Sequence, residues 1–381
     1  MKFSDLKINS QVCELLKRQG IITPTAVQEK IIPLARTGQD LILQAKTGTG
    51  KTLAFLLPTF ERLKKISVTQ SLIIAPTREL ATQISKVAAE IGKILEIESL
   101  LICGGQDIER EKNKLRRTPQ LIIGTPGRLL DHLRRGTIQL KNVNKIIVDE
   151  ADELLKLGFI EDVENLIRET SADRQLILCS ATMPARIRQL AAEFMKKPKE
   201  IFIEKKTVTP ENTKQVIIKT PANKKFSKLV EILETESPYL GIIFCATKEK
   251  TAALALELAK KNFEVDELHG DLTQQQRNFV LKKFREAKIQ ILVATDIAAR
   301  GLDIEGVTHV ISYEVPRDVE TYIHRIGRTG RAGENGTAIT LVAPEEIEKL
   351  RKIERGIKKQ ISVRREQKSS ARNKNKKILT K

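Results

Sequence analysis

Residues 40–52 read DLILQAKTGTGKT, an apolar run that passes through a glycine-containing loop into Gly50-Lys51-Thr52. The run is typical of a buried strand, and helical periodicity follows over 53–65. Gly48 and Gly50 permit a tight loop whose backbone N–H groups face inward, and the helix N-terminus adds a partial positive charge. The stretch therefore predicts a strand, a phosphate-binding loop and a helix in direct succession.

The loop fits a nucleotide site. Lys51 is expected to contact the β and γ phosphates, and the Thr52 hydroxyl to bind Mg²⁺. The usual pattern begins with glycine where this chain has Ala45, a departure of one residue. A chance glycine turn is the alternative, but the strand before it and the helix after it favour nucleotide binding. The residues assigned to the nucleotide here are Ala45, Lys46, Thr47, Gly48, Thr49, Gly50, Lys51 and Thr52.

The stretch KIIVDEADELL at 145–155 begins as a second apolar run and continues into four carboxylates. A phosphate-binding loop needs an acidic partner at the end of a neighbouring strand to hold the metal. Asp149 is expected to coordinate Mg²⁺, partly through water, and Glu150 to polarise the attacking water as the catalytic base. The alternative is a helix start at which the helix dipole favours acids, and Glu153 fits that alternative.

The composition indicates a basic protein without a membrane segment. The 381 residues carry a formal net charge of +19, and residues 351–381, with 13 Lys or Arg and 2 Glu, supply +11 of it. Such a surplus attracts polyanions, of which nucleic acid is the commonest inside cells. No run of 18 apolar residues and no secretory signal is present, so a cytoplasmic location is expected. The four cysteines form no CxxC pair, which argues against zinc and disulfides.

Short apolar runs alternate with helical segments along the whole chain, six in each half. Runs that are apolar on both faces and separated by helices are typical of parallel strands buried between two helical layers. The sequence therefore predicts a doubly wound α/β sheet, present twice. The expected strands lie at 40–45, 71–76, 99–105, 120–126, 145–152, 175–182, 215–220, 241–247, 263–270, 289–295, 308–315 and 336–343.

The domain boundaries follow from the places where the alternation of strands and helices is interrupted. A Lys- and Pro-containing segment interrupts it after Ile203. A helix is expected over 344–356, and the residues that follow are basic and polar. The assignment is a first domain at 1–203, a linker at 204–213, a second domain at 214–350 and a basic, flexible tail at 351–381.

The letters DEAD at 149–152, behind AKTGTGKT, resemble the DEAD-box ATP-dependent RNA helicases of superfamily 2. Each further matching string is weak alone, but their joint order makes the resemblance specific. Ile21 departs from it, because the family usually has an aromatic residue there. The other strings are GIITPTAVQ (20–28), PTREL (76–80), GG (104–105), TPGR (125–128), SAT (180–182), IIFCAT (242–247), QQQR (274–277), ATDIAARGLD (294–303) and HRIGRTGR (324–331).

The resemblance implies two RecA-like domains that bind ATP and Mg²⁺ in their cleft and single-stranded RNA across both. It implies that Gln28 reads the adenine, with Phe3 packing nearby, so that a nucleotide-reading segment covers about 3–28. It also implies that Asp303 approaches the ribose and that Arg328 and Arg331 reach the γ phosphate. Arginine suits this role because phosphoryl transfer needs positive charge at the equatorial oxygens.

The resemblance further implies an RNA-binding set and a coupling set. The RNA-binding set offers backbone N–H, hydroxyl and guanidinium groups, which suit contacts with phosphate and 2′-OH groups. Aromatic residues make up 4% of the chain and Trp is absent, so little sequence preference is expected. The RNA-binding residues are Pro76, Thr77, Arg78, Gly105, Thr125, Gly127, Arg128, Arg277 and Thr295. The residues that couple hydrolysis to unwinding are Asp152, Ser180, Thr182 and His324.

Simpler structural explanations stay open at three of these places. An ion pair at a helix start would account for Arg78 and Glu79. A plain turn would account for the glycine pair at 104–105. Caps of the following helix would account for Ser180 and Thr182.

The expected function is an ATP-dependent RNA helicase that clamps RNA between two domains and locally unwinds short duplexes. Its expected setting is RNA metabolism such as ribosome assembly or RNA decay, and it is expected to act as a monomer. One alternative is a DNA-translocating helicase, and another is a non-catalytic RNA chaperone, which the intact Lys51, Glu150, Arg328 and Arg331 disfavour. The basic tail is expected to add nonspecific RNA affinity that truncation after Gly356 would remove.

Overall fold

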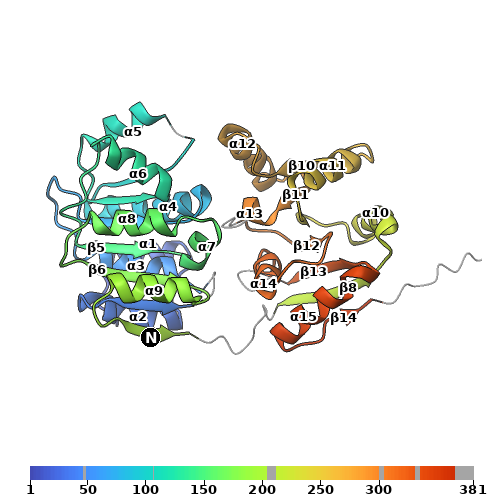
Figure 1. Cartoon of the computed structure of the whole chain (residues 1–381), viewed down its shortest axis with the longest axis horizontal. Coiled ribbons are helices and arrows are strands. Elements are labelled where there is room, and N and C mark those ends of the chain that lie inside the picture. The colour runs from blue at the N-terminus through green and yellow to red at the C-terminus, as the bar shows by residue number, and fades with distance from the viewer. Residues whose placement is uncertain (46–48, 106, 204–211, 300–303, 331–334, 365–381) are drawn as a thin grey trace, which may run out of the picture. The chain divides into compact units, whose positions relative to one another are not determined.

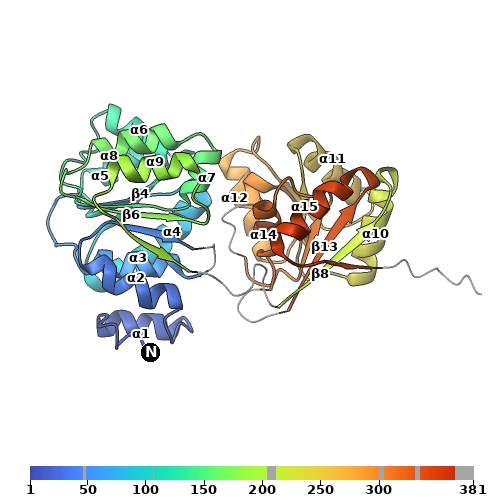
Figure 2. The same ribbon diagram turned by 60° about the horizontal axis from the view of Figure 1, so that its bottom comes forward.

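The computed structural model describes residues 1–45, 49–105, 107–203, 212–299, 304–330 and 335–364. The chain divides into two compact units, and each unit is built on one parallel sheet with helices on both faces (Figure 1; Figure 2). This arrangement confirms the prediction of two tandem doubly wound α/β sheets. In the described ranges, no helix is both long and apolar enough to cross a membrane.

The first unit contains a seven-stranded parallel sheet. Its strands are β1 (Leu41–Gln44), β2 (Ser71–Ile74), β3 (Ser99–Ile102), β4 (Leu121–Gly124), β5 (Lys145–Val148), β6 (Gln175–Ser180) and β7 (Lys199–Phe202). Its helices are α1 (Ser10–Arg18), α2 (Ala26–Arg36), α3 (Lys51–Phe60), α4 (Arg78–Leu95), α5 (Ile108–Leu115), α6 (Pro126–Arg134), α7 (Ala151–Lys156), α8 (Ile160–Arg168) and α9 (Ala185–Phe194). The strand order is β3-β4-β2-β5-β6-β1-β7.

Successive residues of each strand face opposite helical layers, which is why both faces are apolar. In β1, Leu41 and Leu43 pack in the cluster formed with α1–α4. Ile42, between them, packs in the cluster formed with α6–α9. Burying one such side chain contributes about 1.5–3 kcal/mol, so both layers hold the sheet in place. The neighbouring strands of this sheet pair in parallel, and their carboxyl ends therefore share one edge.

The second unit repeats this plan. Its strands are β8 (Thr213–Lys219), β9 (Gly241–Cys245), β10 (Val265–Leu268), β11 (Ile291–Thr295), β12 (His309–Ser312), β13 (Gly336–Val342) and β14 (Ser362–Val363), in the order β10-β11-β9-β12-β13-β8-β14. Its helices are η1 (Ala222–Lys224), α10 (Lys225–Glu236), α11 (Lys248–Ala259), α12 (Gln274–Arg285), α13 (Asp296–Ala299), α14 (Val319–Ile326), η2 (Pro344–Glu346) and α15 (Ile347–Ile357). Helices α10 and α11 cover one face of the sheet, and α14 and α15 cover the other.

The structure adds one edge strand to each predicted set of six. Strand β7 pairs with β1, and β14 pairs with β8. Three of the four residues of β7 and both residues of β14 are exposed. These strands therefore lack the apolar pattern by which a buried strand is predicted, and pairing with a neighbouring strand determines them instead.

The prediction that 351–381 is a flexible tail is wrong for 351–364. These residues complete α15 and form β14, and Ile361 is buried in the core beside them. Arg364 donates its backbone N–H to Ile217 O at 2.8 Å. The physical reason is that Ile361 and the backbone of 362–364 continue the second unit, although the surrounding residues are basic. The rest of the tail, 365–381, lies outside the described residues.

The linker expected at 204–213 ends one residue earlier in the structure. Thr213 is the first residue of β8, and its pairing with Gly336 places it in the second sheet. Residues 204–211 of the expected linker lie outside the described part of the chain.

Lys145, at the start of β5, is a charge buried in the first unit. It is 3% exposed. Its Nζ donates to Ala35 O at 3.5 Å and to Pro58 O at 3.4 Å, in the last turns of α2 and α3. Burial, together with the nearby Arg62, lowers the pKa of Lys145 from 10.5 to about 7. Carbonyl groups at helix C-termini offset only part of the cost of burying this ammonium group.

Lys145→Met should flatten the pH dependence of folding stability. Because the pKa of Lys145 is lower in the folded than in the unfolded chain, the unfolded chain binds more protons above about pH 7, and stability rises with pH up to the unfolded pKa. Between about pH 7 and pH 9 the wild-type chain should gain about 2 kcal/mol that the variant does not gain. Denaturant unfolding at both pH values measures this difference.

The matched control is Lys141→Met, which removes an exposed lysine from the turn before β5. It should leave the pH dependence unchanged. The assignment is contradicted if Lys145→Met and the wild-type chain gain equal stability over the same pH interval.

Candidate functional site

The carboxyl edge of the first sheet carries the predicted residues in two adjoining groups. Strands β1, β6 and β5 are neighbours, and they lead into Ala45, Ser180 and Asp149. Strands β2, β4 and β3 continue the same edge, and β2 and β4 lead toward Pro76 and Thr125. The residues predicted to bind the nucleotide therefore lie on one half of the edge, and the residues of this unit predicted to bind RNA lie on the other half.

The loop after β1 is anchored at both ends. The backbone N–H of Ala45 donates to Ser180 O at 3.0 Å, and its methyl group is buried, so alanine is accommodated where glycine is usual. Gly50 has a φ of +87°, a left-handed conformation that favours glycine. Lys46, Thr47 and Gly48 of the predicted site lie outside the described residues.

Lys51 and Asp149 form a buried pair beside this loop. Lys51 Nζ donates to Ala45 O at 3.0 Å and lies 4.0 Å from Asp149 Oδ1. Burial alone lowers the pKa of Lys51, but the carboxylates of Asp149 and Glu150 outweigh burial and raise it overall. Burial raises the pKa of Asp149, and Lys51 opposes that shift. The arrangement keeps an ammonium group charged where phosphate oxygens would enter.

Glu150 differs from its neighbour Asp149 in exposure and in backbone conformation. Its side chain is half-buried, whereas Asp149 is buried. It has φ 51° and ψ 52° and stands at the N-cap of α7, and its N–H donates to Asp149 Oδ1 at 3.0 Å. A left-handed conformation is uncommon and costly for a residue with a side chain, and such strain is concentrated at functional sites. A half-buried carboxylate here can accept a proton from water.

The segment before α2 holds the loop from the other side. Thr25 caps α2 in a capping box with Gln28. Thr25 Oγ1 donates to Thr49 O at 2.9 Å, and Gln28 Nε2 donates to Gly50 O at 3.1 Å. Gln28 is thus placed beside the phosphate-binding loop. Phe3, predicted to pack near the adenine, is buried in the core formed with α1–α4, and its contact with a nucleotide stays a prediction.

Asp152 and the SAT residues are joined by hydrogen bonds. Asp152 Oδ2 accepts from the Thr182 N–H at 2.8 Å and from its Oγ1 at 2.9 Å. Ser180 Oγ accepts from the Asp152 N–H at 3.2 Å and donates to Thr182 O at 2.6 Å. The alternative that Ser180 and Thr182 cap the following helix is not observed, because α9 has Pro184 at its N-cap and no side-chain cap.

The RNA half of the edge begins with the loops after β2 and β3. Thr77 caps α4, and its Oγ1 accepts from Leu80 N at 3.2 Å. A Cβ added at Gly104 would lie 2.7 Å from Arg78 Nη2, so the guanidinium group packs against this glycine. Gly105 has a φ of +80°. Gly105 therefore has the left-handed conformation of the plain turn given as the alternative, and Gly104 leaves space that the Arg78 guanidinium occupies.

The loop after β4 supplies the remaining RNA residues of this unit. Thr125 is the N-cap of α6 but makes no side-chain cap hydrogen bond. A Cβ at Gly127 would meet no atom within 4 Å, so this backbone is open to an approaching ligand. Arg128 follows in the first turn of α6 with 16% of its side chain exposed, and its Nε donates to Glu111 Oε2 at 2.8 Å.

In the second unit, the predicted residues also lie near strand ends. Arg277 in α12 donates from Nη1 to His269 O at 3.3 Å and from Nη2 to Ala298 O at 3.4 Å, so its guanidinium joins the loop after β10 to α13. Thr295 ends β11 and is half-buried. Arg328 donates its Nε to His324 O at 3.1 Å. Asp303 and Arg331 lie outside the described residues.

Two supporting residues were not predicted from the sequence. Arg325 lies within HRIGRTGR, is 2% exposed, and pairs with Asp296 through Nε at 2.6 Å and Nη2 at 2.9 Å. Its guanidinium also lies over the Phe244 ring, with Cζ 5.1 Å from the ring centroid, which is within the distance of a cation–π contact. Glu111, on α5, contacts Arg128. Asp296 follows the predicted Thr295 and Arg325 follows the predicted His324, and this adjacency is the signal by which they could have been found.

Two family models match the chain. The model described as DEAD/DEAH box helicase matches residues 25–190, and the model described as Helicase conserved C-terminal domain matches residues 224–333. The chain is 46% identical to the DEAD-box ATP-dependent RNA helicase CshA of Geobacillus kaustophilus, over 94% of this chain and 77% of that protein. It is 45% identical to CshA of Bacillus subtilis, over 94% of this chain and 73% of that protein.

Solved structures show the same fold. S. cerevisiae Dbp5 bound to RNA and ADP BeF3 matches with a TM-score of 0.87 and 32% identity, over 95% of each chain. Mss116p bound to ssRNA and AMP-PNP matches with a TM-score of 0.83 and 31% identity, over 94% of this chain and 78% of that chain.

A parallel sheet with a lysine-bearing loop after β1 and an acidic pair after β5 defines a P-loop nucleoside triphosphatase. The matches to two family models and to the curated relatives specify that class further. The chain belongs to the DEAD-box ATP-dependent RNA helicases.

Thr25→Ala should weaken ATP binding by loosening the phosphate-binding loop. The substitution removes both the cap of α2 and the hydrogen bond to Thr49 O. The loss of about 1 kcal/mol corresponds to an increase of about five-fold in the KM for ATP. Steady-state ATPase assays at saturating RNA measure this change.

Thr37→Ala is the matched control at the opposite end of α2, where the hydroxyl donates to Leu34 O at 2.8 Å and accepts from Gln39 N at 3.3 Å, away from the phosphate-binding loop. It should leave the KM for ATP unchanged. An unchanged KM in Thr25→Ala as well would show that this contact does not support the loop.

Proposed function

We propose that this chain closes on ATP and single-stranded RNA together, distorts the RNA so that a short duplex loses pairing locally, and releases the RNA after hydrolysis. One observation carries the proposal: nucleotide residues and RNA residues adjoin along one edge of the first sheet. A change at one group is therefore transmitted over a short distance to the other. The matching Dbp5 structure, which holds RNA and ADP BeF3, supports the pairing of the two ligands.

The proposed chemistry is hydrolysis of the γ phosphate. Lys51 holds the β and γ phosphates, and Glu150 takes the proton from the attacking water. The Asp149 carboxylate and the Thr52 hydroxyl are hard oxygen donors of the kind that Mg²⁺ prefers, so they would hold this ion. When bound, Mg²⁺ supplies positive charge to the phosphate oxygens. Arg328, with Arg331 beyond the described residues, would add charge in the transition state.

The proposed coupling runs through Asp152. Its carboxylate holds Thr182 by two hydrogen bonds, and its N–H donates to Ser180. Because Asp152 stands two positions after Glu150, a shift of the acidic pair on nucleotide binding moves the SAT residues with it. His324 is proposed as the second unit's partner in this coupling.

The proposed RNA contacts are sequence-independent. The first unit offers the backbone at Gly105 and Gly127, hydroxyl groups and the guanidinium groups of Arg78 and Arg128. Arg277 and Thr295 are proposed to continue the contact in the second unit. Such groups recognise phosphate and 2′-OH rather than bases. We also propose a cytoplasmic monomer that contains ATP, Mg²⁺ and RNA in its working complex and serves ribosome assembly or RNA decay.

Glu150→Gln should abolish turnover while ATP still binds. The substitution keeps the size of the side chain but removes the proton acceptor, so kcat should fall by about 100-fold or more with the ATP affinity within a few-fold of wild type. ATPase assays with RNA, and with DNA of equal length, measure the result; only RNA is expected to stimulate the wild-type enzyme. Glu153→Gln, in the same acidic stretch, is the control that keeps turnover. Persistent turnover in Glu150→Gln would show that the base is a different group.

Truncation after Arg364 should flatten the salt dependence of RNA binding. Truncation after Gly356 would also remove the buried Ile361 and β14, so it no longer isolates the tail. Residues 365–381 carry seven Lys or Arg and one Glu. If the tail neutralises about 6 phosphates, its removal should reduce the magnitude of the slope of log affinity against log salt by about 4.

The RNA-free ATPase should be unchanged by this truncation, because it removes none of the nucleotide residues. A chain of full length with Gln at the seven basic tail positions should show the same reduced slope. A slope that stays at the wild-type value in both chains would mean that the tail does not bind RNA.

A further inference from the structure

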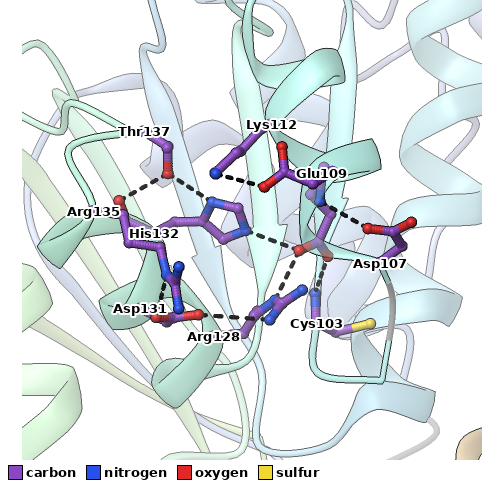
Figure 3. Close-up of polar contacts among 10 residues, drawn as sticks. Cys103, Asp107, Glu109, Lys112, Arg128, Asp131, His132, Arg135 and Thr137 are labelled. Atoms are coloured by element: carbon purple, nitrogen blue, oxygen red, sulfur yellow. Dashed lines mark hydrogen bonds and ion pairs between the residues drawn. The ribbon is translucent and has the colours of Figure 1, made fainter.

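A carboxylate outside the sequence motifs is buried behind the RNA residues of the first unit. Glu111 on α5 has 2% of its side chain exposed. Its Oε1 accepts from the Cys103 N–H at 3.2 Å, and its Oε2 accepts from Arg128 Nε at 2.8 Å. His132 Nε2 lies 2.8 Å from the same Oε2. Figure 3 shows Cys103, Arg128 and His132 converging on this one point from different elements.

His132 is fixed on its opposite side as well. It has 0% of its side chain exposed, and its Nδ1 lies 2.7 Å from Thr137 Oγ1. Thr137 Oγ1 also donates to His132 O at 2.9 Å, which ties the end of α6 to the ring (Figure 3). A buried carboxylate is costly unless its oxygens are hydrogen-bonded. Glu111 meets that requirement with three groups, one from the loop after β3 and two from α6.

The groups that Glu111 holds are next to the proposed RNA contacts. Arg128 is itself a proposed RNA contact. The Nη1 of Arg128 also lies 3.6 Å from Asp131 Oδ2. Cys103 precedes Gly104, against which the guanidinium of Arg78 packs. One carboxylate therefore connects the loop after β3 with the start of α6. It determines where the Arg128 guanidinium lies relative to the glycine loop at 103–105.

We propose that Glu111 is a positioning residue for RNA binding, which holds the Arg128 guanidinium and the glycine loop in one arrangement before RNA arrives. The inference rests on the proposed function, in which Arg128 and Gly105 contact RNA. A side chain that is already ordered loses less conformational entropy on binding, so preorganisation raises affinity. The described contacts of Glu111 are with Cys103, Arg128 and His132, and none of these is a predicted nucleotide residue. Its effect therefore falls on RNA binding and not on hydrolysis.

Glu111→Ala should weaken RNA binding without changing the rate of ATP hydrolysis. The KM for RNA in the stimulated ATPase should rise about ten-fold, because one charge-assisted hydrogen bond to Arg128 is lost. The kcat at saturating RNA and the RNA-free ATPase should stay at the wild-type level. The matched control is Glu109→Ala, on the same helix, where an exposed carboxylate pairs with Lys112 at 2.6 Å. This control should leave the KM for RNA unchanged.

Two conservative variants keep the test valid if the alanine variant does not fold. Glu111→Gln keeps an acceptor for Arg128 and should hold the KM for RNA within about three-fold of wild type. Glu111→Asp keeps the charge but draws the carboxylate back by one methylene group, so the KM for RNA should rise about five-fold. The RNA-free ATPase shows that each variant is folded.

Arg128→Ala separates this inference from the proposed function. It should raise the KM for RNA, and adding Glu111→Ala to it should raise the KM by much less than in the wild-type background, because the two residues act together. If Arg128→Ala leaves the KM unchanged, the proposed RNA contact of Arg128 fails and this inference fails with it. If Arg128→Ala raises the KM but folded Glu111→Ala and Glu111→Asp do not, the proposed function stands and the role of Glu111 is overturned.

Discussion

The parallel register of β1, β6 and β5 is the constraint on which the first unit's site depends. Gln44 lies opposite Ser180, and Val148 lies opposite Leu178, so the phosphate-binding loop, the SAT residues and the acidic pair begin at neighbouring points of one edge. Adjacent strands are about 4.8 Å apart, which is short enough for direct contacts between the loops. A slip of one residue would turn every alternating side chain to the wrong layer, so burial of both faces protects this register.

Two buried lysines of the first unit, Lys51 in α3 and Lys145 in β5, show how neighbouring groups shift the pKa of a buried amine. Lys51 lies beside Asp149 and Glu150, and these carboxylates raise its pKa despite burial. Lys145 donates only to carbonyl groups among its described contacts, and burial lowers its pKa to about 7. Lys51 therefore stays cationic where phosphate binds. The acid at 149–150, unexpected in a basic protein, is what keeps that cation charged in a buried site.

The sequence predicted the sheets and the motif positions because both leave local patterns. Strands apolar on both faces are visible as short runs, and polar motifs stand where those runs end. Strands β7 and β14 were missed because an exposed edge strand is determined by its neighbour. Glu111 was missed for a related reason. It stands in IEREKNKL beside Glu109 and looks like part of a solvated face, yet the fold buries Glu111 and leaves Glu109 exposed.

A protein surface that binds the phosphates and 2′-OH groups of RNA needs support that a surface reading the bases does not need. Bases offer flat faces on which an aromatic ring can settle in several positions, but a phosphate contact depends on where a guanidinium or N–H group points. Aromatic residues make up only 4% of this chain, so directed polar groups must supply the contact. Hydrogen bonds from behind the surface give that direction. Glu111 behind Arg128 is the instance in this chain, and it joins the loop after β3 to α6, which the strands alone would leave independent.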